Sequence, residues 1–132
     1  MSEQARLLMV NAFIGTAGYK KLYQGLGYAV VTEWSERKAI SLVRKSPPAV
    51  IVADFYHQTD FRDRLSNLES LLAAVQGLPA TRILVFYEAA HQGVLDTVRA
   101  RLRIDAALTL PVQEDSLRAT LLAWSKDTAP PV

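Results

Sequence analysis

The sequence predicts an α/β domain with a doubly wound, five-stranded parallel sheet and helices on both faces. Short apolar runs alternate along the chain with segments whose apolar residues recur at helical spacing. A parallel strand needs a crossover, usually a helix, before the next strand can begin. The third run, "PAVIVADFY" at 48–56, ends on the carboxylate of Asp54. Sheets of this kind place their functional crevice beyond the carboxyl ends of the strands, so Asp54 is a candidate site residue.

Each element follows from a local pattern. Near-continuous aliphatic and β-branched runs are typical of buried parallel strands, and they predict strands at 6–13, 28–34, 49–55, 82–89 and 106–110. Apolar stripes at helical spacing predict helices at 16–27, 36–45, 65–76, 92–104 and 114–126. Ser35 suits the N-cap of the second helix, and the two prolines after Ser46 end it. Gly27 and Gly77 close the first and third helices.

Composition excludes several classes of protein. The chain has 132 residues, half of them apolar, which fits one domain at 1–126 and a tail or linker at 127–132. The absence of cysteine excludes disulfides, thiolate metal sites and cysteine nucleophiles. The net charge of +2 comes from scattered basic residues, which predicts no direct nucleic-acid contact. Neither a signal peptide nor the ~20 apolar residues that cross a bilayer can be found, so we expect a cytoplasmic protein without membrane contact.

The stretch "GYAVVTEWSERKAISLVRKSPPAVIVAD" at 27–54 resembles part of a response-regulator receiver domain. Members of that family run from a "GY-V" strand, through a helix with alanine-centred spacing, into an apolar strand that closes on aspartate. The resemblance extends in element order over 6–125. It implies a CheY-like, flavodoxin-like sheet with strand order 2-1-3-4-5. It also implies that Asp54 occupies the position where the family accepts a phosphoryl group from a histidine kinase.

The other chemical positions of the family are altered in this sequence. Mg²⁺ neutralises the charge that phosphoryl transfer brings to a carboxylate, and the family's metal-binding acidic pair corresponds here to Asn11 and Ala12. The family's phosphoryl-binding Ser/Thr corresponds to Tyr87, and its lysine to Leu110. The resemblance therefore implies a pseudo-receiver with no Mg²⁺ cofactor and no catalytic residue, in which Asp54 alone is unaltered.

Two positions near the fifth strand carry further expectations from the resemblance. The proline that follows the family's lysine is kept as Pro111, and the bond before it is usually cis in this fold. We therefore expect a cis Leu110–Pro111 peptide. The family's switch aromatic corresponds to Ala107.

The segment 56–64 after the third strand is longer than its counterpart in the family and lacks the usual proline and glycine. We expect this loop above the former crevice. Asp54 would then be an inherited acid, hydrogen-bonded to loop amides or paired with Arg62 or Arg64. The spacing gives no support to a replacement of the lost acids by two others in this loop, Asp60 and Asp63.

Two loop features have both a chemical and a structural interpretation. His57 and His91 follow the third and fourth strands and could face one crevice with a carboxylate, but loop histidines without fixed spacing are more often surface residues than metal ligands. The turn 14–18, within "FIGTAGYK", places glycines where phosphates dock on helix N-termini. It lacks a dinucleotide fingerprint, and we expect a tight turn.

Basic and aromatic residues are interpreted in the same way. Arg99, Arg101 and Arg103 are expected on the fourth helix near Asp96. Alternate positions on a helix point about 200° apart, so these arginines predict a solvated face and no nucleic-acid patch. Core or rim positions, and no base-stacking platform, are expected for three aromatic residues, Tyr19, Tyr23 and Trp34.

The leading hypothesis is a non-catalytic signalling module whose partner is a histidine kinase or an output protein. By resemblance, the segments 94–104, 106–112 and 116–126 would form the face that makes homodimers or contacts effectors. Trp124 either anchors that face or packs on the domain's own sheet. One alternative is a flavodoxin-like protein that binds a small ligand, nucleotide or flavin through Thr16 and the turn around it. Another is a phosphorylatable receiver with Asp54 as acceptor.

Overall fold

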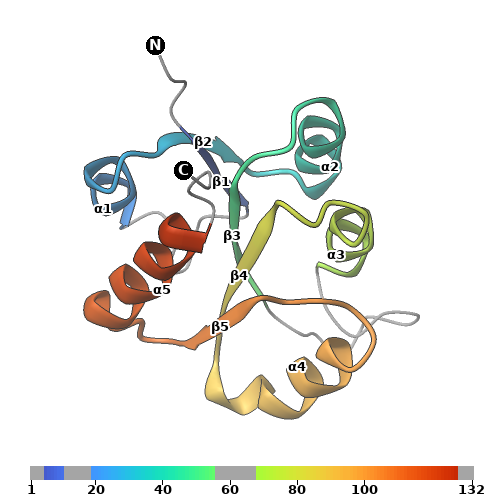
Figure 1. Ribbon diagram of the computed structural model, residues 1–132. Helices are drawn as coiled ribbons and strands as arrows, with labels where there is room; N and C mark the ends of the chain where they lie inside the picture. The colour runs from blue at the N-terminus through green and yellow to red at the C-terminus, as the bar shows by residue number, and fades with distance from the viewer. Residues whose placement is uncertain (1–4, 11–18, 56–67, 128–132) are drawn as a thin grey trace.

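The computed structural model describes residues 5–10, 19–55 and 68–127 of the chain. Its strands form one five-stranded parallel sheet in the order β2-β1-β3-β4-β5, which confirms the expected topology (Figure 1). The strands are β1 (Arg6–Val10), β2 (Ala29–Glu33), β3 (Val50–Asp54), β4 (Arg82–Tyr87) and β5 (Ala106–Thr109).

Helices cover both faces of this sheet. Figure 1 shows α1 and α5 on one side, with α2 and α3 on the other. Residues of α4 pack into the same core as those of α2 and α3. The helices are α1 (Lys20–Gly25), α2 (Glu36–Lys45), α3 (Glu69–Val75), α4 (Gln92–Arg99) and α5 (Glu114–Asp127), with a short 3₁₀ helix, η2 (Ala89–His91), before α4.

Alternate strand residues supply two separate cores, because successive side chains of a strand point to opposite faces. On the α2–α3–α4 face the strands contribute Leu8, Val10, Ile51, Ala53, Ile83, Val85 and Tyr87. On the α1–α5 face they contribute Leu7, Met9, Val50, Val52, Leu84 and Phe86. The near-continuous apolar runs of β1, β3 and β4 are therefore explained by burial on both sides, whereas the edge strands β2 and β5 are only partly buried.

The second helix begins and ends as the sequence predicts. The side chain of Ser35 accepts a hydrogen bond from the amide of Lys38 at 3.3 Å, which is an N-cap contact. Ala39 and Val43 are its buried residues. Gly27, after α1, has a φ of 98°, a conformation that glycine adopts without steric cost.

The expected fourth helix at 92–104 is wrong at its carboxyl end, because α4 stops at Arg99. The chain must reverse there so that β5 can run parallel to β4. Ile104, beyond the helix, is buried in the core of the α2–α3–α4 face. The Arg99 guanidinium donates to the Ile104 carbonyl at 3.0 Å and holds the reversed segment against the helix end.

Among the residues described, we find no helix that combines the length and the apolar character needed to cross a membrane.

Candidate functional site

Three candidate site residues predicted from the sequence lie at the carboxyl edge of the sheet. Asp54, the last residue of β3, pairs with Phe86 of β4. The Leu110 amide, just after β5, donates to the carbonyl of Tyr87 at 2.7 Å. Asp54, Tyr87 and Leu110 therefore end adjacent strands, as the alignment of strand ends predicts. Two other expected members of the site, Asn11 and Ala12, lie outside the described residues.

The Asp54 side chain is buried, with 0% of its surface exposed. It lies two residues after Val52, which belongs to the core on the α1–α5 face, so strand alternation directs its carboxyl group toward that face. The same core holds Phe86 and, half-buried at its margin, Tyr19 and Leu110. The acid thus ends an apolar strand on the side of the sheet that carries this core. Its proposed partners Arg62 and Arg64 lie outside the described residues.

The pKa of Tyr23, in α1, is affected by the charge of Asp54. The Tyr23 ring is fully buried, and burial raises the pKa of its hydroxyl above the usual 10.0, with smaller contributions from Tyr19 and from the charge of Asp54. In the part of the chain that the structure describes, the hydroxyl has no hydrogen-bond partner. By contrast, the hydroxyl of Tyr19, which packs against the same core, donates to the Val112 carbonyl at 3.0 Å.

We predict opposite effects for Tyr23→Phe and Tyr19→Phe. Removing the unsatisfied Tyr23 hydroxyl should leave the free energy of unfolding unchanged at neutral pH or raise it by up to about 1 kcal/mol. Removing the Tyr19 hydroxyl should lower it by about 0.5–1.5 kcal/mol, because the bond to Val112 is lost. Urea denaturation at neutral pH measures both, and a loss above about 1 kcal/mol in Tyr23→Phe would contradict the assignment.

The dependence of stability on pH above about pH 10 provides a second test of the Tyr23 assignment. The folded-state pKa is raised, so the unfolded chain ionises first, and this contribution to stability is intact below about pH 10 and falls as the pH rises further. Tyr23→Phe should therefore lose stability less steeply above that pH than the parent protein does. Tyr28, whose pKa is also raised by burial, keeps part of the slope in the variant.

Tyr87 faces away from Asp54. It belongs to the core on the α2–α3–α4 face, and only 7% of its surface is exposed. Its hydroxyl donates to Gln92 Oε1 at 2.6 Å and accepts from Thr109 Oγ1 at 3.3 Å. Gln92 in turn donates to Asp96 at 2.9 Å. The Tyr87 hydroxyl is therefore hydrogen-bonded to residues of α4 and β5.

The segment after β5 agrees with the expectation from sequence. The Leu110–Pro111 peptide is cis, as predicted. Leu110 is half-buried and packs against the core of the α1–α5 face. The Leu110 side chain thus contributes apolar contact to this core. Ala107 is also half-buried, against the opposite core.

The remaining expectations for the site have mixed outcomes. His91, in η2, is half-buried, whereas His57 lies outside the described residues. The turn 14–18 with Thr16, and the loop 56–64 with Asp60 and Asp63, lie outside them as well. Within the described ranges no group of three or more acidic or histidine side chains is placed to hold a metal ion.

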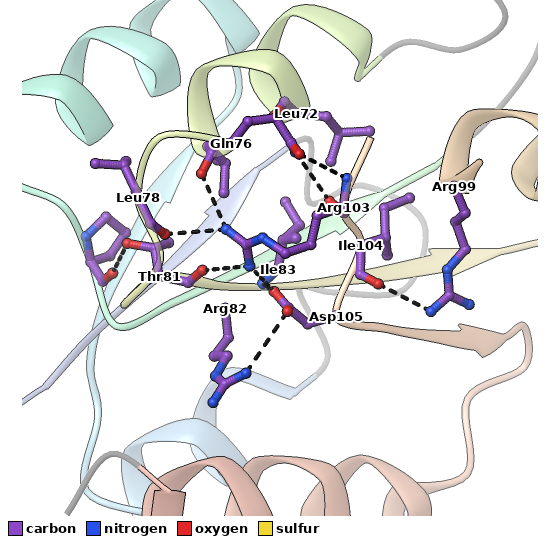
Figure 2. A network of polar contacts seen from close by, with 12 residues as sticks. Leu72, Gln76, Leu78, Thr81, Arg82, Ile83, Arg99, Arg103, Ile104 and Asp105 are labelled. Atoms are coloured by element: carbon purple, nitrogen blue, oxygen red, sulfur yellow. Dashed lines mark hydrogen bonds and ion pairs between the residues drawn. The ribbon is translucent and has the colours of Figure 1, made fainter. Parts of the chain in front are cut away.

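The arginine cluster near the fourth helix is different from the expected solvated face. Arg103 lies beyond α4, and its guanidinium donates to the carbonyls of Val75, Leu78 and Thr81, each at 3.1 Å. It also binds the carboxylate of Asp105 (Figure 2). The prediction was wrong for Arg103 because its partners, at the end of α3 and the start of β4, are 22 to 28 residues away in sequence.

Sequence analysis also missed a group of cations on α2. Arg37, Lys38, Arg44 and Lys45 are all exposed, and they occupy positions three or four residues from Ser41 on either side. Residues at these spacings share one face of a helix. The signal was present in "RKAISLVRK", but a count of basic residues along the chain does not detect it.

Comparison with solved structures identifies the fold. The chain matches a receiver domain from a Francisella response regulator (TM-score 0.71, 18% identity, 95% of this chain and 99% of that one). It also matches CheY-like receiver domains from Methanospirillum hungatei (0.71, 16%, 94% and 96%) and Methylobacillus flagellatus (0.70, 17%, 92% and 99%). The chain has the receiver-domain fold. No model of a protein family matches this receiver-like sequence, and no curated protein matches it.

Proposed function

We propose that this receiver-like domain is a pseudo-receiver, which serves in signal transduction as a protein-interaction module and is not phosphorylated by the Mg²⁺-dependent aspartate mechanism. In this proposal the domain is not an enzyme, binds no Mg²⁺ cofactor and works in the cytoplasm. The observation that carries the proposal is the complete burial of Asp54, whose charge acts on the buried Tyr23 of the core on the α1–α5 face.

The chemistry of the surrounding side chains supports this proposal. Phosphoryl transfer to a carboxylate requires a cation beside the acceptor and donors for the phosphoryl oxygens. At the described positions, Leu110 supplies neither, and the Tyr87 hydroxyl is hydrogen-bonded on the opposite face of the sheet. Asn11 and Ala12 add no carboxylate from the first strand. The described donors therefore do not fit a Mg²⁺ ion, and we derive no step through one.

The surface formed by α4, β5 and α5 is the proposed contact for a kinase, an effector protein or a second copy of the chain. This surface consists of the segments 94–104, 106–112 and 116–126. Trp124 does not anchor it, because this side chain is 8% exposed and packs in the core on the α1–α5 face. Leu122, 44% exposed on α5, is the large apolar side chain that α5 offers to a partner.

The proposal is tested by titrating Mg²⁺ and the phosphoryl mimic beryllofluoride into ¹⁵N-labelled protein. We expect no saturable amide shift near Asp54, Phe86 or Leu110 and no change in tryptophan fluorescence. Asp54→Asn serves as the control, since the amide cannot carry the acyl-phosphate mimic. Saturable shifts in the parent protein that vanish in Asp54→Asn would overturn the proposal and assign Asp54 as a phosphoacceptor.

A further inference from the structure

Large apolar side chains are exposed mainly at one edge of the sheet. Among the described residues the large hydrophobic side chains that are clearly exposed are Val31 (40%), Trp34 (60%), Leu42 (40%) and Leu122 (44%). The first belongs to β2, the second follows β2 directly, and the third belongs to α2. Val31 and Leu42 line one surface hollow, whose floor includes Leu8 and Pro48. An apolar hollow beside exposed apolar side chains is typical of an interaction site.

Among the described residues, no strand pairs with the outer side of the strand at this edge. In the described sheet β2 is the terminal strand and pairs only with β1. Its sequence, AVVTE, has no lysine or proline, which protect many edge strands from adding another chain, and its single charge, Glu33, lies at the strand end. The backbone of β2 therefore presents hydrogen-bonding groups directly beside the hollow.

The helix beside this strand carries mainly positive charge on its exposed surface. The exposed charged residues of α2 are all basic, and its one acid, Glu36 in the first turn, is half-buried. Lys38 and Lys45 lie four residues before and three residues after Leu42, so helix geometry places both beside that exposed leucine. Arg37 and Arg44 line a second hollow on the same helix. Their side chains make no ion pair with any residue that the structure describes.

We propose that this β2–α2 edge, formed by 29–34 and 36–45, binds an acidic segment of a partner protein in extended conformation. The segment pairs with the open side of β2, places apolar side chains in the hollow between Val31 and Leu42, and directs carboxylates toward the cations of α2. Charge complementarity with the four exposed cations of α2 selects an acidic partner.

The apolar hollow favours a polypeptide over a nucleic acid. A phosphate backbone would neutralise the α2 cations but would leave Val31 and Leu42 exposed, whereas alternating acidic and apolar residues satisfy both. This mode uses backbone hydrogen bonds for affinity and side-chain pockets for specificity. It also differs from the α4–β5–α5 surface proposed above, from which β2 is separated by β1, β3 and β4.

The inference rests on the proposed role as an interaction module, yet the two can fail independently. If the pseudo-receiver proposal is wrong, beryllofluoride will shift the amide signals of Asp54 and its neighbours. If the present inference is wrong, the peptide will cause no saturable amide shifts in residues 29–45. Both experiments use the same ¹⁵N-labelled full chain, so each outcome is assigned to its own surface.

The probe is a short synthetic peptide of alternating glutamate and valine, titrated while amide shifts are followed. We expect saturable shifts in 29–33 and 36–45, and binding about tenfold weaker at raised salt or in a Lys38→Glu, Lys45→Glu variant. The matched control is Lys20→Glu, Lys21→Glu on α1, which changes the net charge equally at two exposed lysines and should bind as the parent does. Lys38→Gln, Lys45→Gln repeats the test without adding acids near the end of the helix.

Three comparisons decide the nature of the partner. A glutamate–serine peptide and a Leu42→Ser variant should both bind more weakly, because the apolar contribution is removed. Tighter binding of a single-stranded thymidine oligonucleotide than of the peptide would overturn the proposal in favour of nucleic acid. Absence of saturable shifts at 29–45, or equal weakening by the α1 and α2 charge reversals, would overturn it as well.

Discussion

Replacing Arg103 with alanine is expected to lower the free energy of unfolding by about 2–4 kcal/mol. The guanidinium satisfies three carbonyls at the end of α3 and before β4, and it pairs with Asp105. Its removal takes one donor from each of these carbonyls in a half-buried position, although the Val75 and Leu78 carbonyls keep the amides of Leu78 and Thr81 at 2.9 and 3.1 Å. A missing hydrogen bond there costs more than an exposed one. The Asp105 carboxylate, which accepts from the Ile83 amide at 2.7 Å, also loses its closest cation.

The control for this prediction is Arg101→Ala, two residues away. Arg101 is exposed, and its side chain makes no hydrogen bond or ion pair among the described residues, so its replacement should change stability by less than about 0.5 kcal/mol. Arg103→Lys keeps the charge but not the planar fork, and it should recover only part of the loss. Urea denaturation measures all three variants. Equal stabilities of Arg103→Ala and Arg101→Ala would contradict the role assigned to Arg103.

The two tryptophans provide a second large prediction. Trp124→Ala is expected to cost about 3–5 kcal/mol, because the ring packs in the core on the α1–α5 face with Leu121 and Tyr28. Trp34→Ala removes a ring that is 60% exposed and should cost less than about 0.5 kcal/mol. The same substitution is thus compared in two environments of one protein.

Fluorescence identifies the two rings before stability is measured. A buried indole emits at shorter wavelength than an exposed one, so loss of Trp124 should shift the remaining emission toward longer wavelength and loss of Trp34 should do the reverse. Thermal unfolding then gives the stability of each variant. A small loss in Trp124→Ala, together with disruption of a dimer, would instead support the anchor role that sequence analysis kept open.

Local patterns were sufficient for most of the fold. The period of apolar residues predicted the order of strands and helices, and Ser35 capped α2 as its sequence suggests. The resemblance in 27–54 implied the strand order and the cis Leu110–Pro111 bond, both of which the structure confirms. The fourth helix was predicted too long, because the reversal after Arg99 is imposed by the need to align β5 with β4.

The sequence predicted where the candidate site residues lie, but not how deeply they are buried or which groups they contact. The end of β3 fixed Asp54 at the carboxyl edge, and the neighbouring strand ends followed from the same alternation. Strand alternation alone could not reveal that the carboxyl group is fully buried, because its cover comes from other elements. The direction of the Tyr87 hydroxyl depends likewise on Gln92 and Thr109, which meet it only after folding.

The sequence by itself determined the fold class, the strand ends and the residues available for chemistry, because these depend on periodicity within one element or on the type of one residue. Only the tertiary structure decided which side chains are buried and which share partners. Arg103 became a structural contact, Trp124 a core residue and the α2 cations the margin of an apolar hollow. The physical reason is that burial and hydrogen bonding join segments far apart in sequence, which local spacing does not encode.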